Sequence, residues 1–184
     1  MKTQENLLKA IAGESLARNK YSFFAIRARG DGFESIARIF EETADNEMEH
    51  AERLLEFVND KVKTNTEIYI DPIKSTKENV KIAAEGENYE AEKMYPEFEK
   101  VAIDENQPQI AEVFKEISEV EEKHRDRYLG ILKNLEDGTV FSRNKDIEWK
   151  CLNCGYVHKG KEAPQKCPAC AKPQAWYEPR GFNW

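Results

Sequence analysis

Glutamate and histidine recur along this 184-residue chain at a spacing suited to metal binding. One single glutamate, two E-x-x-H pairs and one E-x-x-E pair share the pattern: Glu14, Glu47 with His50, Glu87 with Glu90, and Glu121 with His124. Residues three apart on an α-helix lie on one face, so each pair can direct two ligand atoms at one point. The chain therefore repeats one plan, a carboxylate followed by E-x-x-H. Carboxylates and E-x-x-H pairs on facing helices form the di-metal site of a four-helix bundle.

A glutamate on a helix is more often part of a solvated face, and this chain is rich in such residues. We assign these glutamates to solvent: Glu41, Glu42, Glu49, Glu52, Glu85, Glu92, Glu99, Glu112, Glu116, Glu119 and Glu122. The proposed ligands differ because each lies on the apolar stripe of its helix, where a charge is costly unless it is neutralised or coordinated. A lone helical histidine is usually structural, but His50 and His124 each follow an inward glutamate by three residues. On the third helix Glu85 is the other candidate ligand, but the residue three positions after it is Asn88, so Glu85 cannot form an E-x-x-E pair.

Carboxylates with two imidazoles favour iron or manganese over zinc, because hard oxygen ligands suit those ions. Seven ligands on two ions leave open coordination positions. Such a site can bind a peroxide or dioxygen unit, which a purely structural site does not need.

The elements that must position these ligands follow from helical periodicity. We expect a first helix over residues 3–29, a Gly-Asp-Gly turn, and a second helix over 33–61. Residues 62–75 lose the period and fit a long crossover connection, as in ferritin-like folds. Ser75 and Glu78 predict a capping box that opens a third helix reaching residue 103, kinked or split near Tyr95 by Pro96. A fourth helix is expected over 108–135.

The four cysteines form two C-x-x-C pairs, Cys151 with Cys154 and Cys167 with Cys170. Two such pairs twelve residues apart indicate a tetrahedral metal site rather than two disulfides. Spacing does not choose between zinc and iron, because four thiolates accept either metal. Aromatic residues surround the pairs and predict a small core with backbone amides directed at the sulfurs: Trp149, Tyr156, Trp176, Tyr177, Phe182 and Trp184. We assign His158 to the surface or to the outer surroundings of this site.

We therefore expect an all-α ferritin-like four-helix bundle over residues 1–136, a linker over 137–147 and a small metal-binding module over 148–184. Residues 148–184 carry six Lys/Arg and three Glu, a net charge of +3. Because the whole chain has a net charge of −7, residues 1–147 have a net charge of −10. The acidic balance argues against nucleic acid as a partner. No apolar run is long enough for a membrane span and no signal segment is evident, so we expect a cytoplasmic protein without a membrane partner.

Together these motifs resemble the rubrerythrin family, whose members join a ferritin-like di-iron bundle to a C-terminal rubredoxin-like module. The resemblance covers nearly the whole chain and includes the run Ala83-Ala84-Glu85-Gly86-Glu87-Asn88-Tyr89-Glu90 and the motif Cys151-Leu-Asn-Cys-Gly-Tyr-Val-His158. It implies that the seven glutamate and histidine residues bind two irons and that the cysteines bind one. It also implies that Tyr21 and Tyr95 hydrogen-bond ligand carboxylates. Ala171 departs from the pattern, because glycine usually follows the second cysteine pair; a positive φ there costs alanine roughly 1 kcal/mol.

The resemblance implies a non-haem peroxidase that reduces hydrogen peroxide to water, with electrons relayed through the mononuclear iron from a donor protein, a rubredoxin or its reductase. We hypothesise that the carboxylate charge in excess of two ferrous ions lets a carboxylate hold a proton for O–O cleavage. A head-to-tail homodimer is expected, with the +3 module docking on a −10 bundle, and helix exchange through residues 62–75 stays open. The alternatives are a ferroxidase or iron-handling protein, and a structural zinc ribbon in place of the iron module.

Overall fold

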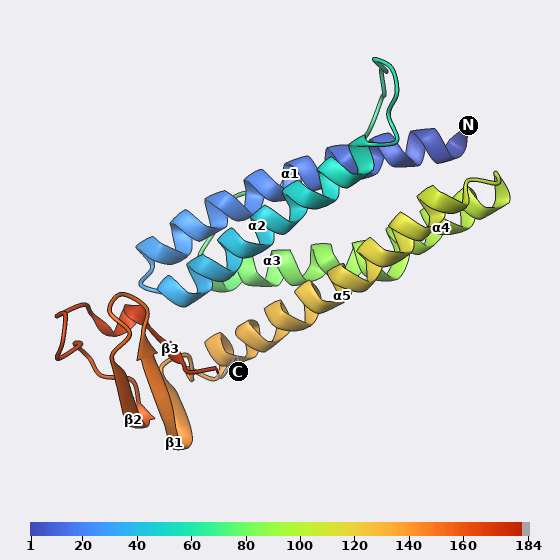
Figure 1. Ribbon diagram of the computed structural model, residues 1–184. Coiled ribbons are helices and arrows are strands. Elements are labelled where there is room, and N and C mark those ends of the chain that lie inside the picture. Colours follow the sequence, from blue (N-terminus) through green and yellow to red (C-terminus); the bar gives the residue numbers. More distant parts are fainter. Residues whose placement is uncertain (182–184) are drawn as a thin grey trace.

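The computed structural model describes residues 1–181 and consists of a long helical bundle with a small β module at one end (Figure 1). Helix α1 (Lys2–Gly30) and helix α2 (Glu34–Leu55) form an antiparallel hairpin. The turn between them contains Gly32 at φ 88°, a left-handed conformation that glycine adopts without steric cost. The expected first helix and its short turn are confirmed.

Helix α2 ends at Leu55, six residues before the expected end at Lys61. Phe57 and Val58 still pack against the bundle, but Asn59 and Asp60 follow, and both favour turns over a continuing helix. The connection therefore spans residues 56–75, contains no helix or strand, and leads to the second helical hairpin. This is the crossover expected of a ferritin-like bundle.

The third helical segment is continuous but changes its winding where it passes the glutamates. Helix α3 (Thr76–Tyr89) begins with the predicted capping box of Ser75 and Glu78. It passes into a π-helical turn, η1 (Glu90–Met94), and then into α4 (Tyr95–Asp104), with Pro96 in the first turn of α4. The helix is not split near Tyr95 as one form of the prediction had it; a π turn just before the proline interrupts the regular α-helical winding instead. Such turns are frequently found at functional sites.

Helix α5 (Pro108–Glu136) completes the bundle, with Pro108 in its first turn as expected. It runs along α3 and α4, just as α2 runs along α1, so the bundle consists of two packed helical hairpins (Figure 1).

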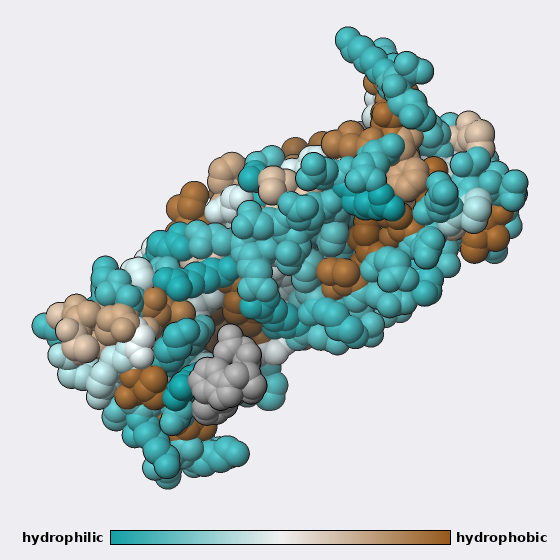
Figure 2. Space-filling model, in the orientation of Figure 1, coloured by the Kyte–Doolittle hydropathy of each residue, from teal (hydrophilic) through white to brown (hydrophobic). Residues whose placement is uncertain are grey.

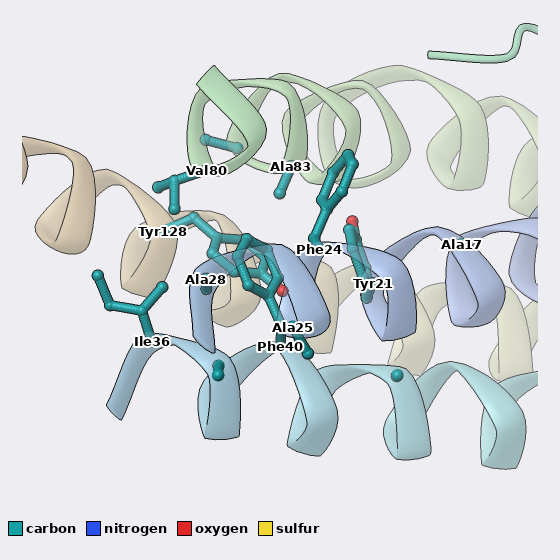
Figure 3. Close-up of a cluster of buried hydrophobic side chains, with 13 residues drawn as sticks. Ala17, Tyr21, Phe24, Ala25, Ala28, Ile36, Phe40, Val80, Ala83 and Tyr128 are labelled. Atoms are coloured by element: carbon teal, nitrogen blue, oxygen red, sulfur yellow. The ribbon is translucent and has the colours of Figure 1, made fainter. Parts of the chain in front are cut away.

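Two apolar clusters fill the interior of the bundle. One contains the aromatic rings of Tyr21, Phe24, Phe40 and Tyr128, which lie between the helices in Figure 3. The other contains the buried side chains of Leu7, Leu54, Tyr95, Phe114 and Ile117. Along each helical segment, the predicted ligand glutamates lie between residues of these two clusters. The glutamates thus form a polar layer enclosed by apolar packing.

The C-terminal module is a three-stranded antiparallel sheet in the order β2-β1-β3. Its elements are β1 (Ser142–Cys151), β2 (Val157–Glu162), a 3-10 turn η2 (Gln174–Trp176) and β3 (Tyr177–Pro179). The linker expected over 137–147 is therefore too long, because residues 142–147 already belong to β1. A register shift between Ser142 and Ile147 interrupts the pairing with β2, which obscures the strand pattern in the sequence.

The module rests on the turn end of the first hairpin. Phe33 stacks on Phe141 with ring centroids 6.0 Å apart, and Arg38 of α2 donates to the Leu152 carbonyl oxygen and lies over the Trp176 ring. None of the described helices is long and apolar enough to cross a membrane.

Candidate metal centres

Four glutamates meet in the interior of the bundle, one from each of α1, α2, α3 and α5. Glu14, Glu47, Glu87 and Glu121 are each at most 1% exposed. Such burial is rare for glutamate, whose charge must be balanced by a partner when water is excluded. The inward phase expected for these four residues is observed.

Their ligand atoms form two groups that share Glu47 and Glu121. One group adds Glu14 and His50, the other adds Glu87 and His124, and within each group the atoms lie within 4.8 Å of one another. Each group would hold one ion, and Glu47 and Glu121 would serve both, as facing helices supply the ligands of a di-metal site.

Both imidazoles direct Nδ1 inward. His50 Nδ1 lies 2.9 Å from Glu47 Oε2 and 3.0 Å from Glu121 Oε1. His124 Nδ1 lies 2.8 Å from Glu121 Oε2 and 3.5 Å from Glu47 Oε1. Each histidine therefore faces the carboxylate three residues before it, as the E-x-x-H spacing predicts.

The carboxylates leave oxygen atoms that a cation or a proton must satisfy. Glu14 Oε2, Glu47 Oε1 and Glu87 Oε2 are buried and have no hydrogen-bond partner. A buried carboxylate oxygen without a partner is strongly unfavourable. The donor set of oxygens with two imidazole nitrogens fits iron or manganese, so the residues present fit the di-metal centre.

Protons balance part of this charge in the metal-free protein. Burial raises the pKa of Glu47 well above its usual range, and burial raises the pKa of Glu87 to about 7. Burial opposes ionisation of Glu121 as well, but hydrogen bonds from His124 and His50 outweigh it and lower its pKa to about 2. Burial likewise opposes the charged form of His124, yet Glu121 and Glu87 raise its pKa to about 10. The site thus holds a surplus of protons that cations can displace.

Glu90 faces the same centre from the first position of the π turn but belongs to neither group. Burial, followed by the charges of Glu14 and Glu87, raises its pKa well above the usual value. Glu90 is therefore close enough for the charges of the other carboxylates to act on it, although its ligand atom lies outside both groups.

Two buried tyrosines hold the carboxylates in place. Tyr21 Oη donates to Glu87 Oε1 at 2.5 Å, and Tyr95 Oη donates to Glu14 Oε1. Burial raises the pKa of both phenols, and the neighbouring carboxylates raise it further, so both keep their protons. The hydrogen bonds expected for Tyr21 and Tyr95 are present.

One contact of the site was missed by sequence reasoning. Asn46 Oδ1 lies 3.3 Å from His124 Nε2, the ring nitrogen that faces away from the carboxylates. Asn46 precedes Glu47, and nothing in the spacing connects it with α5. Its role depends on how α2 and α5 lie side by side.

A groove of about 960 Å³ opens between α2 and α5 on the other side of the centre. Its lining includes His50 together with Arg53, Phe57, Val113 and Ile117. Hydrophobic side chains gather in this hollow between the two helices in Figure 2. The groove connects the His50 side of the centre with the surface.

The four cysteines form the second candidate centre. All are free thiols, so the disulfide alternative is wrong for this structure. Their sulfurs lie within 4.8 Å of one another, and the Cys151–Cys170 and Cys154–Cys167 sulfur pairs are 3.7 Å apart. Metal–sulfur bonds of about 2.3 Å in a tetrahedron place sulfurs about 3.8 Å apart, so the cysteines fit a single tetrahedral ion.

Two similar turns present the sulfurs. Gly155 N donates to the Cys151 carbonyl, and Ala171 N donates to the Cys167 carbonyl, each at 2.9 Å. Gly155 has φ 78° and Ala171 has φ 60°, so the second turn requires the left-handed backbone suspected from the sequence. Alanine there is strained relative to glycine.

Backbone amides are directed at the sulfurs, as predicted. Burial opposes the thiolate of Cys167, but the Tyr177 hydroxyl and the amides of Cys170 and Ala169 outweigh it and lower its pKa to about 6. The Lys172 amide lowers the pKa of Cys170. Trp149, Tyr156, Trp176 and Tyr177 form the expected aromatic core, whereas the predicted members Phe182 and Trp184 lie outside the described residues. His158 belongs to none of the metal-binding groups found in residues 1–181.

Comparisons with known proteins agree with both centres. A rubrerythrin family model matches residues 5–132, and a model for the rubrerythrin rubredoxin-like domain matches residues 149–178. The chain is 47% identical over 184 residues to a rubrerythrin of Porphyromonas gingivalis, covering 100% of this chain and 92% of that protein. It is 44% identical to a rubrerythrin of Nitratidesulfovibrio vulgaris, covering 100% and 96%.

A solved structure titled as the fully reduced, all-ferrous state of nigerythrin is 34% identical, with a TM-score of 0.65 over 97% of this chain and 86% of that one. A bacterioferritin from Desulfovibrio desulfuricans at 22% identity and TM-score 0.66, covering 75% of this chain and 82% of that one, shares the ferritin-like fold. The bundle therefore carries the residues of a di-iron site, and the module carries those of a four-cysteine rubredoxin-like site. The chain belongs to the rubrerythrin family.

Proposed function

We propose that this protein is a non-haem di-iron peroxidase that reduces hydrogen peroxide to water in defence against oxidative stress. In this proposal the four-cysteine iron relays electrons to the bundle. The observation that carries it is the combination, in one chain, of a buried carboxylate–imidazole centre and a separate four-cysteine centre. Membership of the rubrerythrin family supports an iron-based oxidoreductase, and we propose hydrogen peroxide as its substrate and the four-cysteine iron as its relay.

We propose Glu14, Glu47, His50, Glu87, Glu90, Glu121 and His124 as the ligands of two irons, and Cys151, Cys154, Cys167 and Cys170 as the ligands of one. When bound, the iron pair supplies the two electrons that hydrogen peroxide needs. The overall reaction consumes one peroxide, two electrons and two protons and yields two waters.

The chain's own residues would manage the protons. Five carboxylates carry five negative charges against four positive charges on two ferrous ions, which leaves one in excess. Glu90 is the carboxylate best suited to hold the compensating proton, because its pKa is raised and, of the seven proposed ligands, it is the one whose oxygen lies outside both groups in the described residues. The Tyr21 and Tyr95 hydroxyls keep Glu87 and Glu14 oriented while charge at the centre changes.

The groove between α2 and α5 would admit a small substrate. It reaches His50 from the surface, while the two apolar clusters close the ends of the polar layer. Exclusion of bulk water strengthens the electrostatic interactions of the centre and limits side reactions.

We propose an electron-donor protein and a second copy of this chain as partners. The −10 bundle and the +3 module favour docking of the module of one protomer on the bundle of another. An exposed apolar face on α1 and the crossover segment supports association between copies. Its side chains are Phe23, Ile26, Ile68, Tyr69 and Ile70, each at least half exposed. Light scattering of the purified protein would give the oligomeric state.

The decisive test is stopped-flow spectroscopy of anaerobically reduced protein mixed with hydrogen peroxide or with dioxygen. We expect fast reoxidation by peroxide of both the di-iron pair and the red tetrathiolate iron, and slow reoxidation by dioxygen. Faster reaction with dioxygen would favour a ferroxidase. A colourless cysteine site would indicate zinc and would remove the proposed relay.

A further inference from the structure

The two histidines of the di-metal centre are alike on their inner side and different on their outer side. Both Nδ1 atoms face carboxylates at 2.8–3.0 Å. His124 Nε2 faces the Asn46 carbonyl oxygen at 3.3 Å, whereas His50 borders the groove between α2 and α5. Within residues 1–181, His50 Nε2 has no hydrogen-bond acceptor that corresponds to Asn46 beside His124.

A surface ion pair joins α2 to α5 near the place where Asn46 meets His124. Arg127 donates through both Nη atoms to the two carboxylate oxygens of Glu42, each at 2.9 Å. Glu42 lies four residues before Asn46 on α2, and Arg127 lies three residues after His124 on α5. The two contacts are therefore one helical turn apart, so α2 and α5 meet at two neighbouring levels here.

We propose that Asn46 is a positioning residue that keeps His124 in the tautomer and orientation needed for metal binding. A neutral imidazole carries its proton on one nitrogen and its lone pair on the other. The Asn46 oxygen only accepts, so it holds a proton on Nε2 and leaves the lone pair of Nδ1, which lies among the carboxylates, for a metal ion. Outer partners of this kind fix the ring and raise the affinity of metal-binding histidines.

The proposal makes the two halves of the centre unequal. The His124 ring has an acceptor at its outer nitrogen, while the His50 ring borders the groove between α2 and α5. This asymmetry concerns metal binding and does not depend on the peroxidase proposal.

Cobalt(II) binding to the metal-free protein tests the role of Asn46. Zinc first fills the cysteine site, because thiolates prefer it over the oxygen-rich centre. The variants are Asn46→Leu and Asn46→Ala, which remove the acceptor, and Asn46→Asp, which retains one. Asp45→Leu places a leucine on the adjacent exposed position of α2 and is the control for a new apolar side chain.

Calorimetric titration gives the affinity for each cobalt ion, and proton NMR of the cobalt form gives the exchange rates of the imidazole N–H protons. In the unaltered protein we expect one slowly exchanging N–H, from His124, and one that exchanges at least about tenfold faster, from His50. Removing the acceptor should accelerate the slow proton and weaken one cobalt site about tenfold to a hundredfold. Asn46→Asp and Asp45→Leu should retain both properties.

Equal cobalt affinities and unchanged exchange in Asn46→Leu and Asn46→Ala would overturn the proposal. So would a loss of affinity in Asn46→Asp as large as in Asn46→Leu, because the effect would then not come from the acceptor. Neither readout uses peroxide, so this proposal and the proposed activity can fail separately.

Discussion

Tyr21 and Tyr95 differ from the other aromatic residues of the bundle because their hydroxyls donate to carboxylates of the metal centre. Tyr21→Phe removes only an oxygen and leaves Glu87 Oε1 buried without its donor. We expect the free energy of unfolding of the metal-free protein to fall by about 1–3 kcal/mol, the usual cost of such a loss. Cobalt affinity should fall about tenfold, because Glu87 is no longer held in position.

The control for this variant is Tyr89→Phe on α3, since Tyr89 is 55% exposed. Urea unfolding and cobalt titration of both variants would check the expectation. If Tyr21→Phe is as stable and binds cobalt as tightly as Tyr89→Phe, the hydrogen bond to Glu87 contributes nothing measurable.

Ala171 is a second residue whose effect can be isolated. Its φ of 60° favours glycine, so Ala171→Gly should stabilise the module by roughly 1 kcal/mol. Loss of the visible absorption of the tetrathiolate iron during urea unfolding would report the change. Ala169→Gly in the same turn, where φ is not positive, should instead destabilise by about 0.5–1 kcal/mol. Equal effects of the two substitutions would show that the positive φ is not the source of strain.

At the scale of elements, carboxylates from distant parts of the chain cap two helices. Asp31 Oδ2, in the turn after α1, accepts from Thr76 N at 3.0 Å and from Thr76 Oγ1 at 2.8 Å, at the start of α3. Glu105 binds the start of α1 in the same way, through Thr3. These bonds tie the two hairpins together at opposite ends of the bundle, although only a long crossover joins them in sequence.

Asp31→Ala should therefore lower the free energy of unfolding by about 0.5–2 kcal/mol, as for the loss of a helix cap. Asp31→Asn keeps an acceptor and should recover most of the loss. Asp60→Ala, in the exposed crossover, should have little effect. Thermal unfolding of the three variants would separate the cap from a general effect of charge, and a loss in Asp31→Asn equal to that in Asp31→Ala would contradict the cap.

Periodicity in the sequence was enough to predict the four helical segments and the inward phase of the glutamates, because both depend on spacing along one chain. It could not predict the π turn at Glu90–Met94, since Pro96 indicates an interruption but not the winding that resolves it. The role of Asn46 could not be predicted for a different reason: its contact with His124 exists only because α2 and α5 lie side by side. The start of β1 at Ser142 was not predicted, because the register of its pairing with β2 shifts between Ser142 and Ile147.

For the whole molecule, the protons held by the metal-free centre predict how stability depends on pH. The pKa of Glu87 is raised from 4.5 to about 7 and that of His124 from 6.5 to about 10. Between pH 4.5 and 10 the folded protein therefore holds more protons than the unfolded chain, and stability falls as pH rises. The pKa of Glu121 is lowered to about 2, so its contribution is lost as pH falls below 4.5. Stability of the metal-free protein should be greatest near pH 5.

Metal should reverse the slope at acidic and neutral pH. The ions bind deprotonated ligands and displace the extra protons, so the loaded protein should gain stability up to about pH 7, where the unfolded carboxylates and imidazoles are still losing theirs, and stay level above it, while the metal-free protein loses stability throughout. Each pH unit over which one extra proton is held changes the free energy of unfolding by about 1.4 kcal/mol. Urea unfolding of both forms from pH 5 to pH 9 measures the two slopes, and Glu87→Gln should flatten the metal-free curve below pH 7. Parallel curves for the two forms would mean that the centre does not exchange protons for metal, because only that exchange gives the slopes opposite signs.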